Sequence, residues 1–251
     1  MRLAAVLALI ALAVHPAARA EMAARTETPR PVTIAVIGDS LAEGLWASLY
    51  RQFARDPAIR IVNATRASTG FNGDFYDEPL ERLLERPRID LLIVHTGAND
   101  RQRAVSLDGH ERALFESPLW YAYYSQHLTH FLARTQQRGI PVLWVGLPVM
   151  RDAAYDRGMR IISRLHQEHA ERHGARFLDI AGFTADADGA FVEHLATGKG
   201  RKRRFRHADG VHFWEFGYDR VAAHVLTAIR ARFPSLLPEA PARAELPSHK
   251  P

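Results

Sequence analysis

The sequence predicts an α/β fold in which a parallel β-sheet is covered by helices on both faces. Short apolar runs typical of strands alternate along the chain with longer stretches whose apolar residues recur at helical spacing. The candidate strands are apolar throughout, as expected for parallel strands that are buried on both faces. The length of 251 residues suits one sizeable domain with its own core.

Five apolar runs are the candidate strands of this sheet. In chain order they are residues 32–37, 59–62, 89–94, 140–145 and 177–180. In an open parallel sheet, ligands bind beyond the carboxyl ends of the strands. Ser40, Gly70 and Asn99 each follow a candidate strand end, so these three residues can converge at one site.

Five stretches between and after these strands have the features of helices. Ser117 and Pro118 form an N-cap followed by proline in the first turn, and Gly139 and Gly174 provide stop signals. The expected helices cover residues 40–54, 80–84, 118–137, 154–173 and 215–233.

The N-terminal 20 residues are typical of a secretory signal peptide. Arg2 precedes an apolar run of 12 residues, and Ala18-Arg19-Ala20 forms a small-residue cleavage site. We expect cleavage after Ala20 and a periplasmic protein, with an uncleaved signal anchor as the alternative. Residues 21–31 are then a linker, residues 32–235 the folded domain, and residues 236–251 a disordered, proline-rich tail.

Composition excludes some kinds of site and points to one charged segment. The chain has no cysteine, which rules out disulfides, thiolate metal sites and a cysteine nucleophile. The net charge of +5 becomes +3 without residues 1–20, which hold two arginines and no acidic residue. Residues 199–206 carry six basic side chains in eight positions. Because export argues against nucleic acid, the open readings are an anionic glycan, anionic lipid headgroups or a solvated loop.

Four short motifs suggest an acyl-transfer site. In chain order they are Gly38-Asp39-Ser40-Leu41, Gly70, Gly97-Ala98-Asn99-Asp100 and Asp209-Gly210-Val211-His212. Gly38 permits a tight turn from strand to helix, so the Ser40 hydroxyl projects outward and its N–H lies at the positive helix end. The alternative is that Ser40 is merely an N-cap.

The other motifs supply the partners that a serine nucleophile needs. Asp209 lies three residues before His212, so its carboxylate can orient one ring nitrogen while the other nitrogen faces Ser40. An incidental histidine after an Asp-Gly turn is the alternative. Asn99 has a side-chain amide donor and Gly70 an unobstructed backbone N–H, which together with the Ser40 N–H could hold an oxyanion.

These motifs resemble those of the SGNH hydrolase superfamily, also called the GDSL esterases, over residues 32–233. The resemblance implies a flavodoxin-like, three-layer α/β/α sandwich with a five-stranded parallel sheet. It further implies Ser40 as nucleophile, Asp209 and His212 as its partners, and an oxyanion hole of Ser40, Gly70 and Asn99, with no metal or cofactor. Gly73 lies close to Gly70, which is preferred because it follows Ser68-Thr69 in the family-like position.

Neighbouring residues are similar to a bacterial envelope branch associated with O-acylation of glycans. The segments that carry this similarity are residues 97–102, 120–124, 146–151 and 206–213. They imply an acylated, and in one reading anionic, carbohydrate substrate and a membrane-bound partner that donates acyl groups. Candidate substrate contacts are Asp39, Trp120, Arg101 and Arg151, although Trp120 could equally belong to the core.

The sequence therefore predicts an exported serine esterase or O-acyltransferase acting on O-acyl groups of envelope carbohydrate, with O-acetyl as the favoured group. A lipid esterase or thioesterase is one alternative, and a noncatalytic glycan-binding protein on an esterase fold is another. His166, His169 and His173 share helical spacing that could bind a metal. Their charged neighbours instead favour a solvated helix face.

Overall fold

The computed structural model describes residues 30–197 and 201–237. The predicted signal peptide, most of the linker at residues 21–31 and residues 238–251 of the predicted tail lie outside the described residues. Within the described ranges, no helix combines the length and the apolarity needed to cross a membrane.

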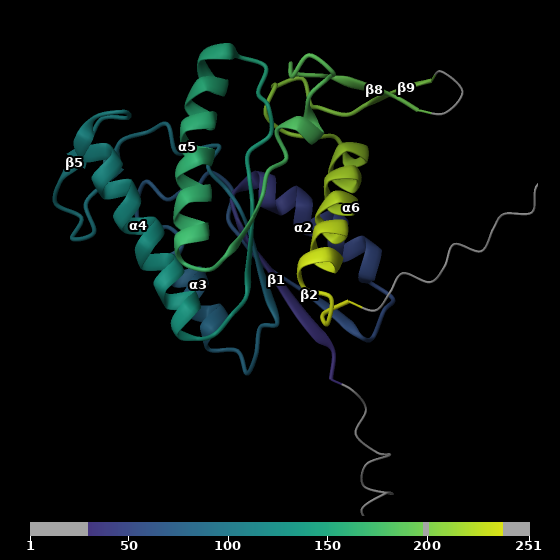
Figure 1. The fold of residues 1–251 in the computed structure, drawn as a ribbon, viewed down its shortest axis with the longest axis horizontal. Helices are drawn as coiled ribbons and strands as arrows, with labels where there is room; N and C mark the ends of the chain where they lie inside the picture. The colour runs from purple at the N-terminus through teal and green to yellow at the C-terminus, as the bar shows by residue number, and fades with distance from the viewer. Residues whose placement is uncertain (1–29, 198–200, 238–251) are drawn as a thin grey trace, which may run out of the picture. The chain divides into compact units, whose positions relative to one another are not determined.

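A five-stranded parallel sheet forms the centre of the domain (Figure 1). Its strands follow the order β2-β1-β3-β6-β7, and every neighbouring pair is parallel. The bounds are β1 Val32–Gly38, β2 Ile59–Thr65, β3 Leu91–His95, β6 Val142–Val145 and β7 Arg176–Leu178. The structure thus confirms the predicted α/β class and the five parallel strands.

Helices cover both faces of this sheet, which confirms the three-layer arrangement (Figure 1). On one face lie α2 (Ser40–Phe53) and α6 (Glu215–Arg232), joined where the carboxylate of Asp219 accepts hydrogen bonds from Ser48 and Arg51. On the other face lie α3 (Asp77–Leu84), α4 (Pro118–Gln137) and α5 (Ala153–Arg172).

The register of the sheet brings the loops after three strands together. Gly38, the last residue of β1, lies opposite both Thr65 of β2 and His95 of β3. The chain therefore leaves these neighbouring strands at the same edge of the sheet, towards Ser40, Gly70 and Asn99. This edge is the carboxyl edge, where the sequence predicts the site.

The sequence missed the smallest elements, ended β2 at residue 62 rather than 65, and placed the end of the domain too early. The missed elements have only two or three residues each. They are one hairpin of β4 (Ala104–Val105) and β5 (Arg112–Ala113), a second hairpin of β8 (His194–Ala196) and β9 (Lys202–Arg204), and the 3₁₀-helix η1 (Gly182–Thr184). Such lengths are too short to show a hydrophobic period. Leu237 is 6% exposed, so the packed domain extends past the predicted boundary at residue 235.

Candidate active site

The turn from β1 into α2 depends on a glycine. Gly38 has φ of +147°, which residues with a side chain rarely adopt, and a Cβ there would lie 2.0 Å from the carbonyl oxygen of His95. The absence of a side chain lets the loop after β3 approach the turn closely. The next residues, Asp39 and Ser40, begin α2 directly at the carboxyl edge of the sheet.

Asp39 ties this turn to the loop after β3. Its Oδ1 accepts a hydrogen bond from the N–H of Leu41 at 2.9 Å, and its Oδ2 accepts from the N–H groups of Gly97 and Ala98 at 3.0 and 3.1 Å. Burial raises the pKa of Asp39 to about 6, although these N–H donors favour the carboxylate.

Two sequence-based interpretations change as a result. Asp39 is fully buried and its carboxylate is engaged by backbone donors, so the expectation that it contacts substrate is wrong. Asp39 is also the N-cap of α2. The alternative role considered for Ser40, that of an N-cap, is therefore filled by its neighbour, and the Ser40 hydroxyl is directed elsewhere.

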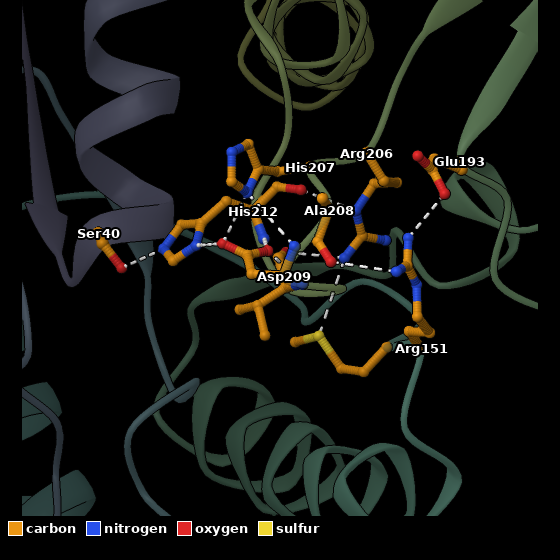
Figure 2. Close-up of polar contacts among 10 residues, drawn as sticks. Ser40, Arg151, Glu193, Arg206, His207, Ala208, Asp209 and His212 are labelled. Carbon is orange, nitrogen blue, oxygen red and sulfur yellow. Dashed lines mark hydrogen bonds and ion pairs between the residues drawn. The ribbon is translucent and has the colours of Figure 1, made fainter.

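Ser40, His212 and Asp209 form a continuous hydrogen-bonded row (Figure 2). The Ser40 Oγ lies 2.7 Å from His212 Nε2, and His212 Nδ1 lies 2.8 Å from Asp209 Oδ2. The structure thus brings together three residues that the sequence assigned to one site across a separation of more than 160 positions. The side chains of His212 and Asp209 are 36% and 39% exposed, so this row lies at the protein surface.

Hydrogen bonds hold Asp209 as a carboxylate that faces the imidazole. Its Oδ1 accepts from the N–H groups of Val211 at 2.8 Å and His212 at 3.0 Å. Partial burial raises the pKa of Asp209, but these two N–H groups and the His212 ring outweigh it and hold that pKa well below its ordinary value. A carboxylate so placed favours the His212 tautomer whose proton is on Nδ1 and whose Nε2 accepts from Ser40.

The loop that carries Asp209 and His212 is held by two arginines (Figure 2). Arg151 donates from Nη1 to the carbonyl of Ala208 at 3.0 Å, while its Nη2 is paired with Glu193 at 2.8 Å. Its guanidinium, expected to contact substrate, is thus bound to the loop and to Glu193.

Arg206 holds the same loop from inside the protein. Its side chain is fully buried and donates to the carbonyls of Val149 at 2.6 Å, Val211 at 2.7 Å and His212 at 3.3 Å. The guanidinium also lies 4.3 Å from the centre of the Phe213 ring. The sequence did not reveal this role, because Arg206 is the end of a basic run for which only a polyanion-binding segment or a solvated loop was considered.

Hydrogen bonds to the Gly97-Ala98-Asn99-Asp100 motif hold the loop around Gly70, one on each side of the glycine. Asn99 Nδ2 donates to the carbonyl of Thr69 at 3.0 Å, and Asp100 Oδ2 accepts from the N–H of Phe71 at 3.2 Å. A Cβ on Gly70 would lie 1.5 Å from Asp100 Oδ1. This close approach joins Gly70 to Asn99 and Asp100, whereas the contact that a Cβ on Gly73 would meet is Phe75.

A further candidate substrate contact has a structural role instead. Trp120 is fully buried, stacks on Tyr124 with ring centres 4.6 Å apart and donates from its indole N–H to the carbonyl of Gln102 at 2.9 Å. The expectation that Trp120 contacts substrate is therefore wrong, and Trp120 belongs to the core. Arg101 is exposed, with its guanidinium 5.8 Å from the Phe115 ring and 5.7 Å from the Tyr155 ring, and its contact with substrate stays a prediction.

The expected solvated histidine face on α5 is also wrong for two of its three members. His166 is fully buried and its Nε2 lies 2.7 Å from the Tyr124 hydroxyl, while His169 is 5% exposed. Burial lowers the pKa of His166 to about 3. Within the described residues, no group of three or more histidine or acidic side chains is arranged to hold a metal ion.

Comparisons with known proteins agree with this architecture. The family described as "Protein of unknown function (DUF459)" matches residues 33–228. Among curated proteins, none matches this sequence. Several solved structures share the fold at low sequence identity.

Three of these structures illustrate the similarity. A GDSL-like lipase from Bacteroides thetaiotaomicron superposes with a TM-score of 0.55 at 13% identity, covering 85% of this chain and 97% of that one. An acetylxylan esterase variant from Geobacillus stearothermophilus gives 0.56 at 15%, covering 80% and 96%. An esterase from Pseudoalteromonas sp. gives 0.53 at 15%, covering 80% and 98%. The predicted three-layer α/β/α fold is thereby confirmed, and these three enzymes share it.

Proposed function

This chain belongs to the DUF459 family, and we propose that it is an exported serine esterase or O-acyltransferase. Its substrate would be an O-acyl group, with O-acetyl favoured, on a carbohydrate of the cell envelope. The observation that carries the proposal is the row from Ser40 Oγ through His212 to Asp209, with successive distances of 2.7 and 2.8 Å. Such a row activates a serine hydroxyl for attack on a carbonyl carbon.

The first half of the reaction forms an acyl-enzyme. The Ser40 Oγ attacks the acyl carbonyl carbon while its proton passes to His212 Nε2, and Asp209 stabilises the resulting imidazolium. The oxyanion of the tetrahedral intermediate is held by the N–H groups of Ser40 and Gly70 and the amide of Asn99. The ester C–O bond then breaks, and the departing sugar oxygen takes the proton from His212.

Two of the three oxyanion donors, the Ser40 N–H and the Asn99 amide, have a structural reason to be available. The Ser40 N–H lies in the first turn of α2, where backbone N–H groups lack helical partners. The Asn99 amide carries two N–H bonds, and one of them binds Thr69. Removing one such donor typically lowers turnover by about 10²–10³.

The second half of the reaction decides between a hydrolase and a transferase. His212 takes a proton from water or from a sugar hydroxyl, and the resulting oxygen nucleophile attacks the acyl-Ser40 carbonyl. The bond between the acyl carbon and Ser40 Oγ then breaks, and Ser40 Oγ regains its proton from His212. Water yields the free acid, whereas a sugar hydroxyl yields a new ester. The route needs neither metal nor cofactor. In the transferase case, a membrane-bound partner could supply the acyl groups.

The carbohydrate substrate is supported by fold similarity to an acetylxylan esterase and by the envelope-type segments of the sequence. Export is supported by the signal-peptide pattern of residues 1–20. A solvent-accessible catalytic row is compatible with a polymeric substrate, because a polymer cannot enter a closed pocket.

The test is hydrolysis of p-nitrophenyl acetate by residues 21–251, beside Ser40→Ala and the matched control Ser125→Ala on α4. We expect Ser40→Ala to lose at least about a hundredfold in kcat/KM and Ser125→Ala to retain wild-type turnover. A p-nitrophenyl phosphonate should release p-nitrophenol once and leave its phosphonyl group on the Ser40 peptide. Equal rates for wild type and Ser40→Ala would overturn the serine assignment.

A lipid esterase is the second candidate, and one observation favours it. Leu114 and Leu119 are 62% and 57% exposed, and exposed apolar side chains of this kind can contact a lipid acyl chain. A lipid esterase should prefer p-nitrophenyl decanoate over acetate, whereas the proposed enzyme should prefer acetate.

If acetylated glycan binds equally to wild type and Ser40→Ala and is never turned over, the noncatalytic glycan-binding reading holds instead.

A further inference from the structure

The β8–β9 hairpin presents a cluster of cations at the protein surface. Arg201, Lys202, Arg203 and Arg204 are all exposed, and we refer to these four residues as the cationic hairpin. Across residues 30–197 and 201–237, none of the four forms an ion pair with an acidic side chain. Their charges are therefore available to a partner.

Aromatic rings hold two of these cations in place. The guanidinium carbon of Arg203 lies 4.0 Å from the centre of the Phe216 ring, and that of Arg204 lies 5.5 Å from the centre of the Trp214 ring. Such contacts orient an arginine without neutralising it, unlike a carboxylate partner. Of the nearby acids, Glu193 is already paired with Arg151, and Glu215 lies exposed in the first turn of α6.

The cationic hairpin is continuous with the catalytic loop. Beyond β9, the carbonyl of Phe205 accepts a hydrogen bond from the N–H of Trp214 at 3.0 Å, and Arg206 forms a β-bridge with Phe213. The chain leading out of the hairpin thus runs beside the residues that directly follow His212.

Side chains continue this connection from the cationic hairpin to the catalytic row. The Trp214 ring, which contacts Arg204, also lies 4.8 Å from the His207 ring. His207 Nδ1 in turn lies 3.0 Å from Asp209 Oδ2. Arg204, Trp214 and His207 therefore form a chain of contacts that ends at the Asp209 carboxylate, which orients His212.

We propose that the cationic hairpin and Trp214 form a subsite for negatively charged groups of the substrate, so that the preferred ester is carried by a polyanionic carbohydrate. The inference rests on the proposed function. Trp214 is 38% exposed and offers an aromatic surface beside a cation, which suits a sugar ring that bears a carboxylate or phosphate. A membrane surface would attract the same charges but needs no aromatic platform next to the catalytic carboxylate.

The test compares two polymers of matched acetyl content, O-acetylated polygalacturonate and O-acetylated mannan, as substrates of residues 21–251. We expect kcat/KM to favour the anionic polymer by about tenfold or more in about 0.01 M salt, where the screening length is about 30 Å. The preference should largely vanish in about 1 M salt, where that length is about 3 Å.

The variant that tests the site is Arg201→Gln/Lys202→Gln/Arg203→Gln, which keeps Arg204 on Trp214. It should lose most of the preference for the anionic polymer. The control is Arg55→Gln/Arg60→Gln, which removes two exposed arginines beyond the far end of α2, about 20 Å along the helix from Ser40. The control should keep the wild-type preference. A preference that survives in the hairpin variant or in high salt would overturn the inference.

Binding of non-acetylated polygalacturonate, followed by tryptophan fluorescence, separates this inference from the proposed function. Wild type should bind this polymer and the hairpin variant should bind it at least about fivefold more weakly at low salt. This result stands even if no ester is hydrolysed, in which case the proposed function alone fails. Hairpin-dependent binding to phosphatidylglycerol vesicles without binding to polygalacturonate would assign the surface to lipid and overturn the inference.

Discussion

The Nη2 atom of Arg206 lies 2.7 Å from the carbonyl oxygen of Val211, the residue immediately before His212. This guanidinium is buried, and among the described residues no carboxylate forms an ion pair with it. Backbone carbonyls and aromatic rings contact it instead. Burial lowers the pKa of Arg206 to about 10, so the side chain stays charged at neutral pH. The catalytic loop is thus organised around a buried cation whose planar fork reaches several carbonyls at once.

Replacing the Arg206 guanidinium with a lysine ammonium group should lower kcat more than it changes KM. Arg206→Lys keeps the charge but cannot reach the carbonyls of Val149, Val211 and His212 together. We expect kcat on p-nitrophenyl acetate to fall by about 10–100-fold with a much smaller change in KM, because His212 is displaced relative to Ser40. Chemical denaturation should show a loss of about 1–3 kcal/mol from carbonyls left without a donor.

A matched control distinguishes loop positioning from general loss of an arginine. Arg232 also donates to a backbone carbonyl, that of Phe177 at 2.7 Å, but it lies at the far end of α6. Arg232→Lys should leave kcat unchanged. If Arg206→Lys retained full kcat, the loop would be held adequately by Arg151 and the backbone alone.

Asp209→Asn should separate the structural role of the carboxylate from its electrostatic role. The amide oxygen of asparagine can still accept from the N–H groups of Val211 and His212, so the loop should keep its conformation. The amide nitrogen would then face His212 Nδ1 and favour the wrong tautomer. We expect kcat to fall by about 10²–10⁴ with a Tm close to that of the wild type. A variant with wild-type kcat would show that Asp209 is dispensable for orienting His212.

The sequence predicted those parts of the fold and site that depend on local patterns. The apolar runs of the five strands and the four-residue repeat of Leu41, Leu45 and Leu49 reflect burial against the sheet, which a single sequence displays. Ser40, Asp209 and His212 could be assigned because their motifs are short and local. The structure then places them within hydrogen-bonding distance of one another.

The errors concern residues whose surroundings come from distant segments. Asp39 lies in a motif with a catalytic serine, but its partners at positions 97 and 98 come from another loop. Arg206 and Arg204 are two positions apart in one basic run, yet one is fully buried and the other exposed. Charge patterning cannot distinguish them, because the carbonyls that solvate Arg206 carry no sequence signal.

Gly70→Ala should displace the loop that carries a proposed oxyanion donor. The new Cβ would overlap Asp100 Oδ1, which is itself confined by the hydrogen bond from the Tyr124 hydroxyl to Oδ2. We expect kcat to fall by about 10²-fold or more and stability by about 1–3 kcal/mol. The matched control is Gly182→Ala, where a Cβ would meet no atom within 4 Å.

A double-mutant cycle tests whether this collision is the cause. Asp100→Ala removes the oxygen that the new methyl group would meet. The stability loss of Gly70→Ala/Asp100→Ala should therefore be smaller than the sum of the single losses by about 0.5–3 kcal/mol. Strictly additive losses would show that the two sites do not collide and that the Gly70 loop relaxes in another direction.

Asp100→Asn should change how stability depends on pH. Burial raises the pKa of Asp100 from 3.8 to about 7, although hydrogen bonds from Tyr124 and the Phe71 N–H favour its charged form. Below pH 3.8 the carboxyl is protonated in both the folded and the unfolded states. As the pH rises towards 7 the unfolded chain releases this proton first, so the free energy of unfolding falls.

Asparagine removes that titration while its oxygen can still accept from Tyr124 and Phe71. The variant should therefore gain stability relative to the wild type as the pH rises from about 4 to about 7, by at most about 4 kcal/mol. Other buried groups also make the free energy of unfolding depend on pH. Asp39, with a pKa raised to about 6, lowers this free energy as the pH rises, as Asp100 does. His95 and His166, with pKa values lowered to about 4 and about 3, have the opposite effect. These groups are present in both proteins, so the difference between two series of urea denaturation curves isolates Asp100. A difference that stays constant over this range would mean that Asp100 is charged in the folded protein throughout, with its burial compensated by the surrounding donors.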